Sequence, residues 1–218
     1  MAGVAVFDII GTCFSLDRPR NALTGLGAPA GLLDTWFAQS LRDYFAFSHA
    51  GGYAPLKDVL QAALPRTLTK AGVRHSAEDV QSVIATFAEL DPRPEFPEAA
   101  EHLHSRGWRL IALTNGAEQS TRDLLERAGV AGSFGEVISC DSIGVTKPNP
   151  AVYRLAAERS GGADLWMIAA HAWDIAGASR AGMRTAFITV VEGQYLGVYP
   201  QPDVTADNLL EAARKIAP

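Results

Sequence analysis

One segment near the start of the chain sets its architecture: residues 4–12 read Val4-Ala-Val-Phe-Asp8-Ile-Ile-Gly11-Thr12. The apolar run Val4–Phe7 is typical of a short strand that is buried on both faces of a parallel sheet. The run ends on Asp8, and after Gly11-Thr12 the hydrophobic pattern changes from that of a strand to that of a helix. The segment therefore predicts a first strand that carries a carboxylate at its carboxyl end.

The chain from about residue 14 to about residue 90 has the periodicity of helices. Apolar side chains recur at three- and four-residue spacing over residues 33–45 and again over residues 56–64. Ser76 and Asp79 resemble a capping box at the start of a further helix. This block is therefore expected to be all-helical.

A proline-rich connector follows the helical block. Residues 91–97 read Asp-Pro-Arg-Pro-Glu-Phe-Pro, and three prolines in so short a segment are typical of a stiff linker. We therefore predict a helical cap domain over residues 14–96 and a core domain made of residues 1–13 and 97–218.

After residue 97, predicted strands and helices alternate. Strands are expected at 108–113, 136–139, 165–170 and 185–191. Of the five helices expected between and around them, three end near Gly107, Gly129 and Gly182, one begins near Pro150, and the last spans 206–216. This order predicts an α/β fold, with a Rossmann-like parallel sheet, helices on both faces and an all-helical cap inserted after the first strand. Ligands of such sheets bind outside the carboxyl ends of the strands, which is where the insertion leaves the core.

Composition excludes several classes of function. The chain has 48% hydrophobic and 20% charged residues, and 19 Lys and Arg against 24 Asp and Glu give a net charge of −5. This balance is globular, and it offers no basic surface for nucleic acid or anionic membrane. Two cysteines without a CxxC motif fit a reduced, cytoplasmic protein, and neither a basic leader nor an 18-residue apolar run is present.

Four chemically active segments share one position, the carboxyl end of a predicted strand. They contain Asp8 with Thr12, Thr114 with Asn115, Lys147 in Val-Thr-Lys-Pro, and Asp174 in His-Ala-Trp-Asp. A lysine beside a carboxylate lowers the carboxyl pKa and keeps the group ionised as a nucleophile. The second carboxylate could hold the lysine or orient a water molecule.

In order and spacing, these segments resemble the motifs of the haloacid dehalogenase superfamily, and most closely those of its type II, or (S)-2-haloacid, dehalogenase branch. The resemblance covers nearly the whole chain. It implies that Asp8 is the covalent nucleophile, paired with Lys147, and that Asp174 is the acidic residue of the fourth motif. It also implies that Thr12 and Thr114 bind oxygen atoms of the substrate or of the ester intermediate.

The resemblance also predicts substrate-binding positions, which are Ile10, Trp36, Phe37, Asn115, Tyr153 and His171. Tyr153 matches the branch. The branch usually has an aromatic residue in place of Ile10, an arginine in place of Phe37, and an asparagine in place of His171. The anion-binding part of the site therefore differs from that of the branch, while the catalytic residues are retained.

Three of these positions have alternative interpretations. His171 could act as a general base in ester hydrolysis, or it could be a hydrogen-bonding residue behind the site that replaces the asparagine of the branch. Trp36 and Phe37 could line a substrate pocket, or they could be part of the packing of the cap.

Phosphatases of this superfamily have a general-acid aspartate two residues after the nucleophile, where this chain has Ile10. They often have a metal-binding aspartate where it has Ala170. An isoleucine cannot donate a proton, and a magnesium site would lack oxygen ligands. A halide leaving group needs neither a proton donor nor a magnesium ion. The sequence therefore predicts a metal-independent hydrolase that acts on carbon–halide bonds of small 2-substituted carboxylic acids.

Other functions stay open from the sequence alone. They are a magnesium-dependent phosphatase, a non-catalytic binding protein of the same fold, and an enzyme that displaces another leaving group, such as the ring amine of a strained cyclic acid. The expected partner is a small-molecule substrate, with no cofactor, nucleic acid or membrane. The family resemblance adds a possible homodimer.

Overall fold

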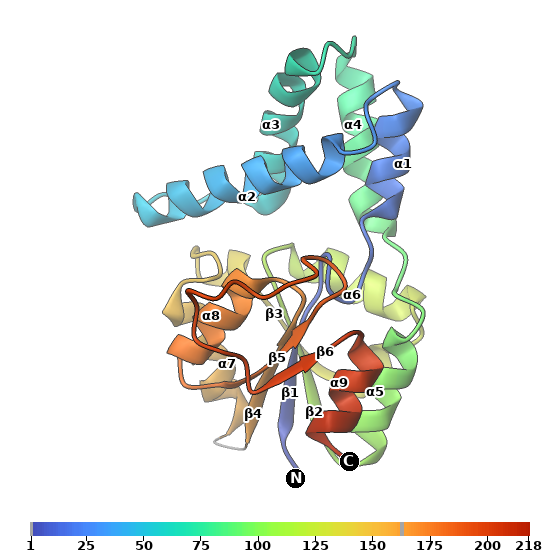
Figure 1. Cartoon of the computed structure of the whole chain (residues 1–218). Coiled ribbons are helices and arrows are strands. Elements are labelled where there is room, and N and C mark those ends of the chain that lie inside the picture. Colours follow the sequence, from blue (N-terminus) through green and yellow to red (C-terminus); the bar gives the residue numbers. More distant parts are fainter. Residues whose placement is uncertain (1, 162–163) are drawn as a thin grey trace. The chain divides into compact units, whose positions relative to one another are not determined.

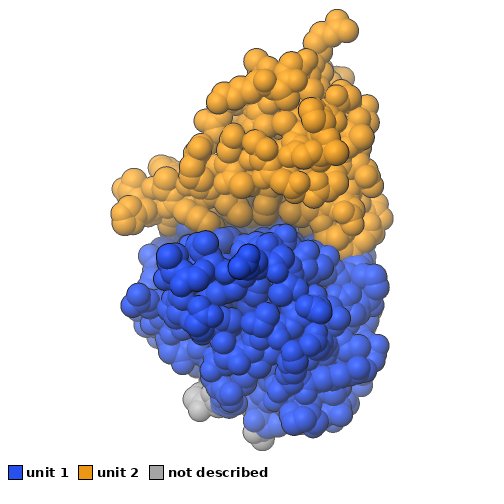
Figure 2. Space-filling view, in the orientation of Figure 1, with its two compact units in different colours: residues 1–14, 92–218 blue, residues 15–91 orange. Residues whose placement is uncertain are grey.

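The computed structural model describes residues 2–161 and 164–218, and these form two compact units. The first unit consists of residues 1–14 and 92–218 and the second of residues 15–91 (Figure 2). The first unit is the α/β core, and the second is all-helical.

The core contains a parallel sheet with the strand order β3-β2-β1-β4-β5-β6 over the described residues (Figure 1). The strands are β1 Val4–Asp8, β2 Arg109–Thr114, β3 Phe134–Ser139, β4 Leu165–Ala169, β5 Arg184–Ile188 and β6 Val204–Ala206. All the strand pairs are parallel, and β1 lies between β2 and β4. The central strand is fully buried, as its apolar run predicts.

Helices cover both faces of this sheet (Figure 1). They are α5 Phe96–Ser105, α6 Glu118–Arg127, α7 Pro150–Ser160, α8 Ala172–Arg180 and α9 Leu209–Ile216. Local sequence fixes several helix ends. The Asn149 side chain caps α7 by accepting a hydrogen bond from Ala151 N, Pro150 occupies the first turn, and Gly161 ends the helix with φ 72°.

The helical unit contains α1 Asp17–Gly25, α2 Leu32–His49, α3 Leu56–Lys70 and α4 Ala77–Ala85, followed by the 3₁₀ turn Thr86–Glu89. Its predicted capping box is confirmed, because Ser76 and Asp79 exchange hydrogen bonds between side chain and backbone. The second unit boundary lies at Asp91/Pro92, before the predicted residue 97. Pro92 pairs with Phe14, and Arg93 binds backbone oxygens of the core, so both belong to the core.

The predicted α/β class is confirmed, with differences at the C-terminal end of the chain. The strand expected at 185–191 ends at Ile188, and the helix expected from residue 206 begins at Leu209. The short edge strand Val204–Ala206 was not predicted. Three residues are too few for a hydrophobic period, so only its pairing with β5 identifies it.

Gly177 of α8 lies against the ring of Tyr153 on α7. A Cβ atom at this position would lie 2.6 Å from the Tyr153 hydroxyl oxygen, and a fully buried ring has little room to move. We therefore expect Gly177→Ala to lower the free energy of unfolding by about 1–3 kcal/mol through overpacking. Urea denaturation measures this change.

Gly132→Ala is the matched control, because a Cβ atom there would meet nothing within 4 Å. It should change the unfolding free energy by no more than about 0.5 kcal/mol. Equal effects of the two substitutions would contradict the packing argument.

Candidate active site

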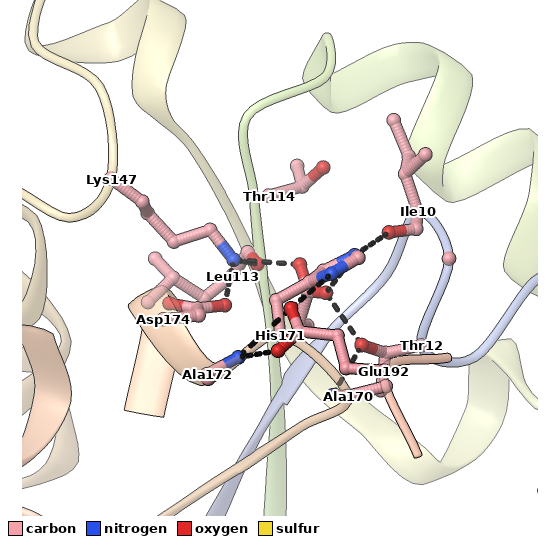
Figure 3. Close-up of polar contacts among 12 residues, drawn as sticks. Ile10, Thr12, Leu113, Thr114, Lys147, Ala170, His171, Ala172, Asp174 and Glu192 are labelled. Carbon is pink, nitrogen blue, oxygen red and sulfur yellow. Dashed lines mark hydrogen bonds and ion pairs between the residues drawn. The ribbon is translucent and has the colours of Figure 1, made fainter. Parts of the chain in front are cut away.

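A buried lysine joins two carboxylates at the carboxyl end of the sheet (Figure 3). Lys147 Nζ donates to Asp8 Oδ1 and to Asp174 Oδ2, each at 2.7 Å, and to the Leu113 carbonyl at 2.9 Å. The three hydrogen bonds match the three protons of an ammonium group. The side chains of Lys147 and Asp174 are completely buried, and that of Asp8 is 6% exposed. The arrangement is therefore a desolvated ion cluster.

Sheet register explains why these residues meet. Asp8 is the last residue of β1 and pairs with Leu113 of β2, so the lysine bridges two adjacent strand ends. Asp174 comes from the first turn of α8, which follows β4 on the other side of β1. Residues that are distant in sequence thus converge because parallel strands end at one edge of the sheet.

Thr12 holds the second oxygen of the Asp8 carboxylate. Its hydroxyl donates to Asp8 Oδ2 at 2.6 Å and accepts from Ala170 N at 2.9 Å. Arg93 fixes the turn that carries Thr12, because its guanidinium donates to the carbonyl oxygens of Gly11 and Thr12. Both Asp8 oxygens are therefore oriented by donors from other parts of the core.

Asp174 is held on both sides. The Tyr153 hydroxyl donates to Asp174 Oδ1 at 2.6 Å, while Lys147 occupies Oδ2. The structure thus uses the second carboxylate to orient the lysine, and it places the predicted residue Tyr153 behind that carboxylate.

The cluster separates the two carboxyl pKa values. Burial favours the neutral form of Asp8, but the charges of Lys147 and His171 and the hydrogen bonds from Lys147 and Thr12 outweigh it, so the pKa of Asp8 lies below its usual range. Burial and the negative charge of Asp8 raise the pKa of Asp174. Burial also opposes the charge of Lys147, but the two carboxylates raise its pKa above the usual value. Asp8 is therefore the ionised carboxylate that a nucleophile requires.

The turn after β2 contains two of the predicted residues. Asn115 Oδ1 accepts a hydrogen bond from the backbone nitrogen of Lys147 at 3.0 Å, which fixes the segment that carries the lysine. Thr114 Oγ1 accepts from Gly116 N at 2.9 Å within its own turn. Asn115 thus supports the site through the backbone, and an oxygen-binding role of Thr114 stays a prediction.

His171 lies near the Oδ2 atom of Asp8, whereas Lys147 binds Oδ1. Its Nε2 is 3.3 Å from the carbonyl oxygen of Ile10 and 4.0 Å from Asp8 Oδ2, and its Nδ1 is 3.6 Å from Glu192 Oε1. The side chain of Ile10 points to the neighbouring turn, where its Cδ1 would lie 3.1 Å from a Cβ atom at position 116. Both predicted residues therefore belong to the core around Asp8.

Trp36 and Phe37 pack within the helical unit. Trp36 is fully buried, donates from Nε1 to the Leu60 carbonyl at 3.2 Å, and meets the Phe87 ring edge-on. Phe37 stacks on the Phe87 ring, with the ring centroids 6.5 Å apart and an interplanar angle of 19°. These contacts describe packing of the helical unit, and a substrate-lining role stays a prediction.

Sequence reasoning missed several residues that support the site. Glu192 lies in the loop after β5, outside every motif, and only the fold brings it to His171. Arg93 appeared as part of the proline connector, and the Leu113 carbonyl has no side-chain signature at all. Trp173 lies inside the fourth motif and stacks on His171 with ring centroids 5.2 Å apart.

The described residues contain neither a metal-binding cluster nor a helix fit to cross a membrane. Across residues 2–161 and 164–218, no group of three or more His, Cys, Asp and Glu side chains is placed to hold a metal ion. None of the helices in that same part of the chain combines the length and the apolar character that a bilayer crossing needs.

Lys147 provides a direct test of the ion cluster. We expect Lys147→Met to lower the free energy of unfolding by about 3–5 kcal/mol, because it leaves two buried carboxylates without their counterion. Urea denaturation at neutral pH measures the loss. Lys57→Met, at an exposed lysine of α3, is the control and should stay within about 0.5 kcal/mol of the wild type. A loss for Lys147→Met no larger than that of the control would contradict a desolvated cluster.

Comparison with known proteins agrees with this geometry. A family model for haloacid dehalogenase-like hydrolases matches residues 3–182. The chain is 29% identical over 213 residues to an (S)-2-haloacid dehalogenase of Pseudomonas sp. (strain YL), covering 94% of this chain and 90% of that protein. It is 27% identical to haloacetate dehalogenase H-2 of Moraxella sp. (strain B), with coverages of 84% and 83%.

A solved structure has the same fold. The L-2-haloacid dehalogenase of Xanthobacter autotrophicus, with chloropropionic acid covalently bound, superposes with a TM-score of 0.87 at 23% identity. The alignment covers 99% of this chain and 98% of that one. Since the family model spans more than half of the sequence, the chain belongs to the haloacid dehalogenase-like hydrolases.

Proposed function

We propose that the protein is a hydrolytic dehalogenase that acts on small 2-haloacids of (S) configuration. The observation that carries this proposal is the Asp8 carboxyl group, which is held by Lys147 on one oxygen and by Thr12 on the other. A carboxylate so oriented is an activated nucleophile. The substrate class comes from the similar proteins, which are 2-haloacid dehalogenases, and the nucleophilic mechanism comes from Asp8 and its two partners.

In the proposed first step, an Asp8 oxygen attacks C2 of the substrate. The carbon–halogen bond breaks, the halide leaves with the bonding electrons, and an ester joins Asp8 to the acid. In the second step, water attacks the ester carbonyl carbon, which releases a 2-hydroxy acid and restores the aspartate. Lys147 and Thr12 orient Asp8 in both steps, and Asp174 with Tyr153 keeps Lys147 in place.

We also propose substrate-binding residues, which are given for each unit by itself. In the core we assign Ile10, Asn115 and Thr114 to the substrate side of Asp8, with Thr114 as the donor to a substrate or ester oxygen. In the helical unit we assign Trp36 and Phe37. Phe37 stands where the branch usually has an arginine, so recognition of the substrate carboxylate must differ from that in the branch.

The proposed reaction requires no cofactor. A halide is a stable anion, so its departure needs neither a proton donor nor a metal ion. Ile10 and Ala170, which stand where related phosphatases have acidic residues, support this assignment. A magnesium-dependent phosphatase would lack a proton donor for its alkoxide at the first of these positions.

Halide release tests the function. We expect halide from (S)-2-chloro- or (S)-2-bromopropionate in the presence of EDTA, because the reaction requires no metal ion. Asp8→Asn should abolish the release, since an amide is not a nucleophile of this kind, while circular dichroism and the unfolding midpoint show that the variant is folded. The (R) enantiomers and fluoroacetate complete the panel.

Other results would redirect the assignment. If the wild type releases no halide from any of these acids, dehalogenation is excluded. Phosphate esters with Mg²⁺ and strained cyclic amino acids are then the next substrates to measure. If halide release survives Asp8→Asn, Asp8 is not the nucleophile.

Two further properties are proposed, a location from the cysteines and an oligomeric state from the resemblance. We propose a cytoplasmic location, which the free, buried Cys13 and Cys140 support because both remain unpaired thiols. We also propose a homodimer. Light scattering on the purified protein tests the second point and should give about twice the chain mass of 23.2 kDa, whereas a monomer mass would contradict it.

A further inference from the structure

We propose that His171, held by Glu192, is the general base that activates water for hydrolysis of the Asp8 ester. This inference rests on the proposed function, because it assigns a residue to that reaction's second step. In the dehalogenase branch the position is usually asparagine, which cannot accept a proton from water at neutral pH. The histidine therefore adds a capability that the family resemblance does not supply.

The ring of His171 is fixed in position from several sides. Trp173 stacks on it with an interplanar angle of 12°, and Glu192 lies at its Nδ1. Gly11, with φ 86°, allows the Nε2 edge of the ring to lie close to the backbone, because a Cβ atom at this position would lie 2.8 Å from Nε2. The imidazole is thus preorganised next to the nucleophile, and only 8% of its side chain is exposed.

Glu192 is a positioning residue with its own anchor. Both of its carboxylate oxygens lie 3.2 Å from Ala172 N, the first amide of α8 (Figure 3). A carboxylate is stabilised at the N-terminus of a helix, where amide groups are free to donate. Glu192 therefore places a carboxylate oxygen 3.6 Å from His171 Nδ1, which favours the proton on Nδ1 and leaves Nε2 on the side of the Ile10 carbonyl and Asp8.

The distance from His171 to Asp8 fits a water-mediated step. Nε2 is 4.0 Å from Asp8 Oδ2, which is too long for a direct hydrogen bond and close enough for contact with a water that attacks the Asp8 carbonyl carbon. Asp174 is less suited to this task, because Lys147 and Tyr153 already donate to its two oxygens.

The charges around His171 change during the cycle. Burial disfavours the imidazolium, but the nearby Glu192 carboxylate and the charges of Asp8 and Asp174 outweigh it, so the pKa of His171 is raised in the free enzyme. Ester formation removes the negative charge of Asp8. The pKa of His171 then falls, and the ring can lose its Nε2 proton to solvent and become a base when a base is required.

The proton balance of the step is complete. Nε2 of the neutral ring takes a proton from water as the water oxygen bonds to the ester carbonyl carbon. The tetrahedral intermediate then collapses, the bond to the alcohol oxygen breaks, and His171 returns the proton to that oxygen. Asp8 is left as a carboxylic acid, which loses its proton to solvent and regains its ion pair with Lys147.

His171→Gln tests the assignment, because glutamine can form hydrogen bonds but cannot act as a base. We expect a first-turnover release of about one equivalent of halide per enzyme, at a rate close to that of the wild type. Steady-state turnover should fall about 100-fold or more. Intact-protein mass spectrometry after acid quench should show the ester accumulating on the protein.

Glu192→Gln provides a second readout through the pH dependence of kcat. A base must be neutral, so kcat rises with pH through the pKa of His171 in the esterified enzyme. The Glu192 carboxylate raises that pKa, so its removal should move the acidic limb of the profile to lower pH. Glu126→Gln, at an exposed residue of α6, is the matched control and should leave the profile unchanged.

The outcomes separate the two proposals. If the wild type gives neither halide nor ester, the proposed function fails and this inference fails with it. If the wild type turns over and His171→Gln keeps its steady-state rate within twofold, the general-base role is wrong. The role is also wrong if the first-turnover burst and the steady state fall together without an ester, or if Glu192→Gln leaves the acidic limb in place.

Discussion

A single buried ammonium group organises this molecule. Lys147 has no exposed surface, and its three donors are used by two carboxylates and one strand-end carbonyl. Burying an ion is costly unless its partners are close and well oriented, so the cluster requires the sheet, the turn after β2 and the first turn of α8 to be in place together. The fold and the reactivity of Asp8 thus depend on the same contacts.

The two carboxylates in this cluster differ because of their surroundings. Asp174 is enclosed, with both oxygens accepting hydrogen bonds from Lys147 and Tyr153. Asp8 faces the strand-end edge, where Thr12 and His171 add a hydroxyl and a ring that can carry positive charge. The pKa values of two similar side chains are therefore shifted in opposite directions, which is a common route to distinct chemical roles in one site.

Much of the fold and of the central cluster could be predicted from the sequence, and the reasons are physical. The apolar run before Asp8 indicates a buried strand, and the hydrophobic periods after residue 97 indicate alternating strands and helices. Both signals are contained in short stretches of sequence. Glu192 could not be found in this way, because its only signal is proximity to His171 across the end of the sheet. The edge strand β6 was missed since three residues carry too little pattern.

The two segments that connect the core to the helical unit contact each other where they leave the core. Phe14 pairs with Pro92, and Cys13 accepts a hydrogen bond from Arg93 N, so the chain leaves and re-enters the core at neighbouring points. An insertion with adjacent ends can change in length or sequence without stretching the sheet that it interrupts, since its closure is already provided. The helical unit can therefore vary in sequence, including at position 37, without changing the strands that carry the lysine–carboxylate cluster.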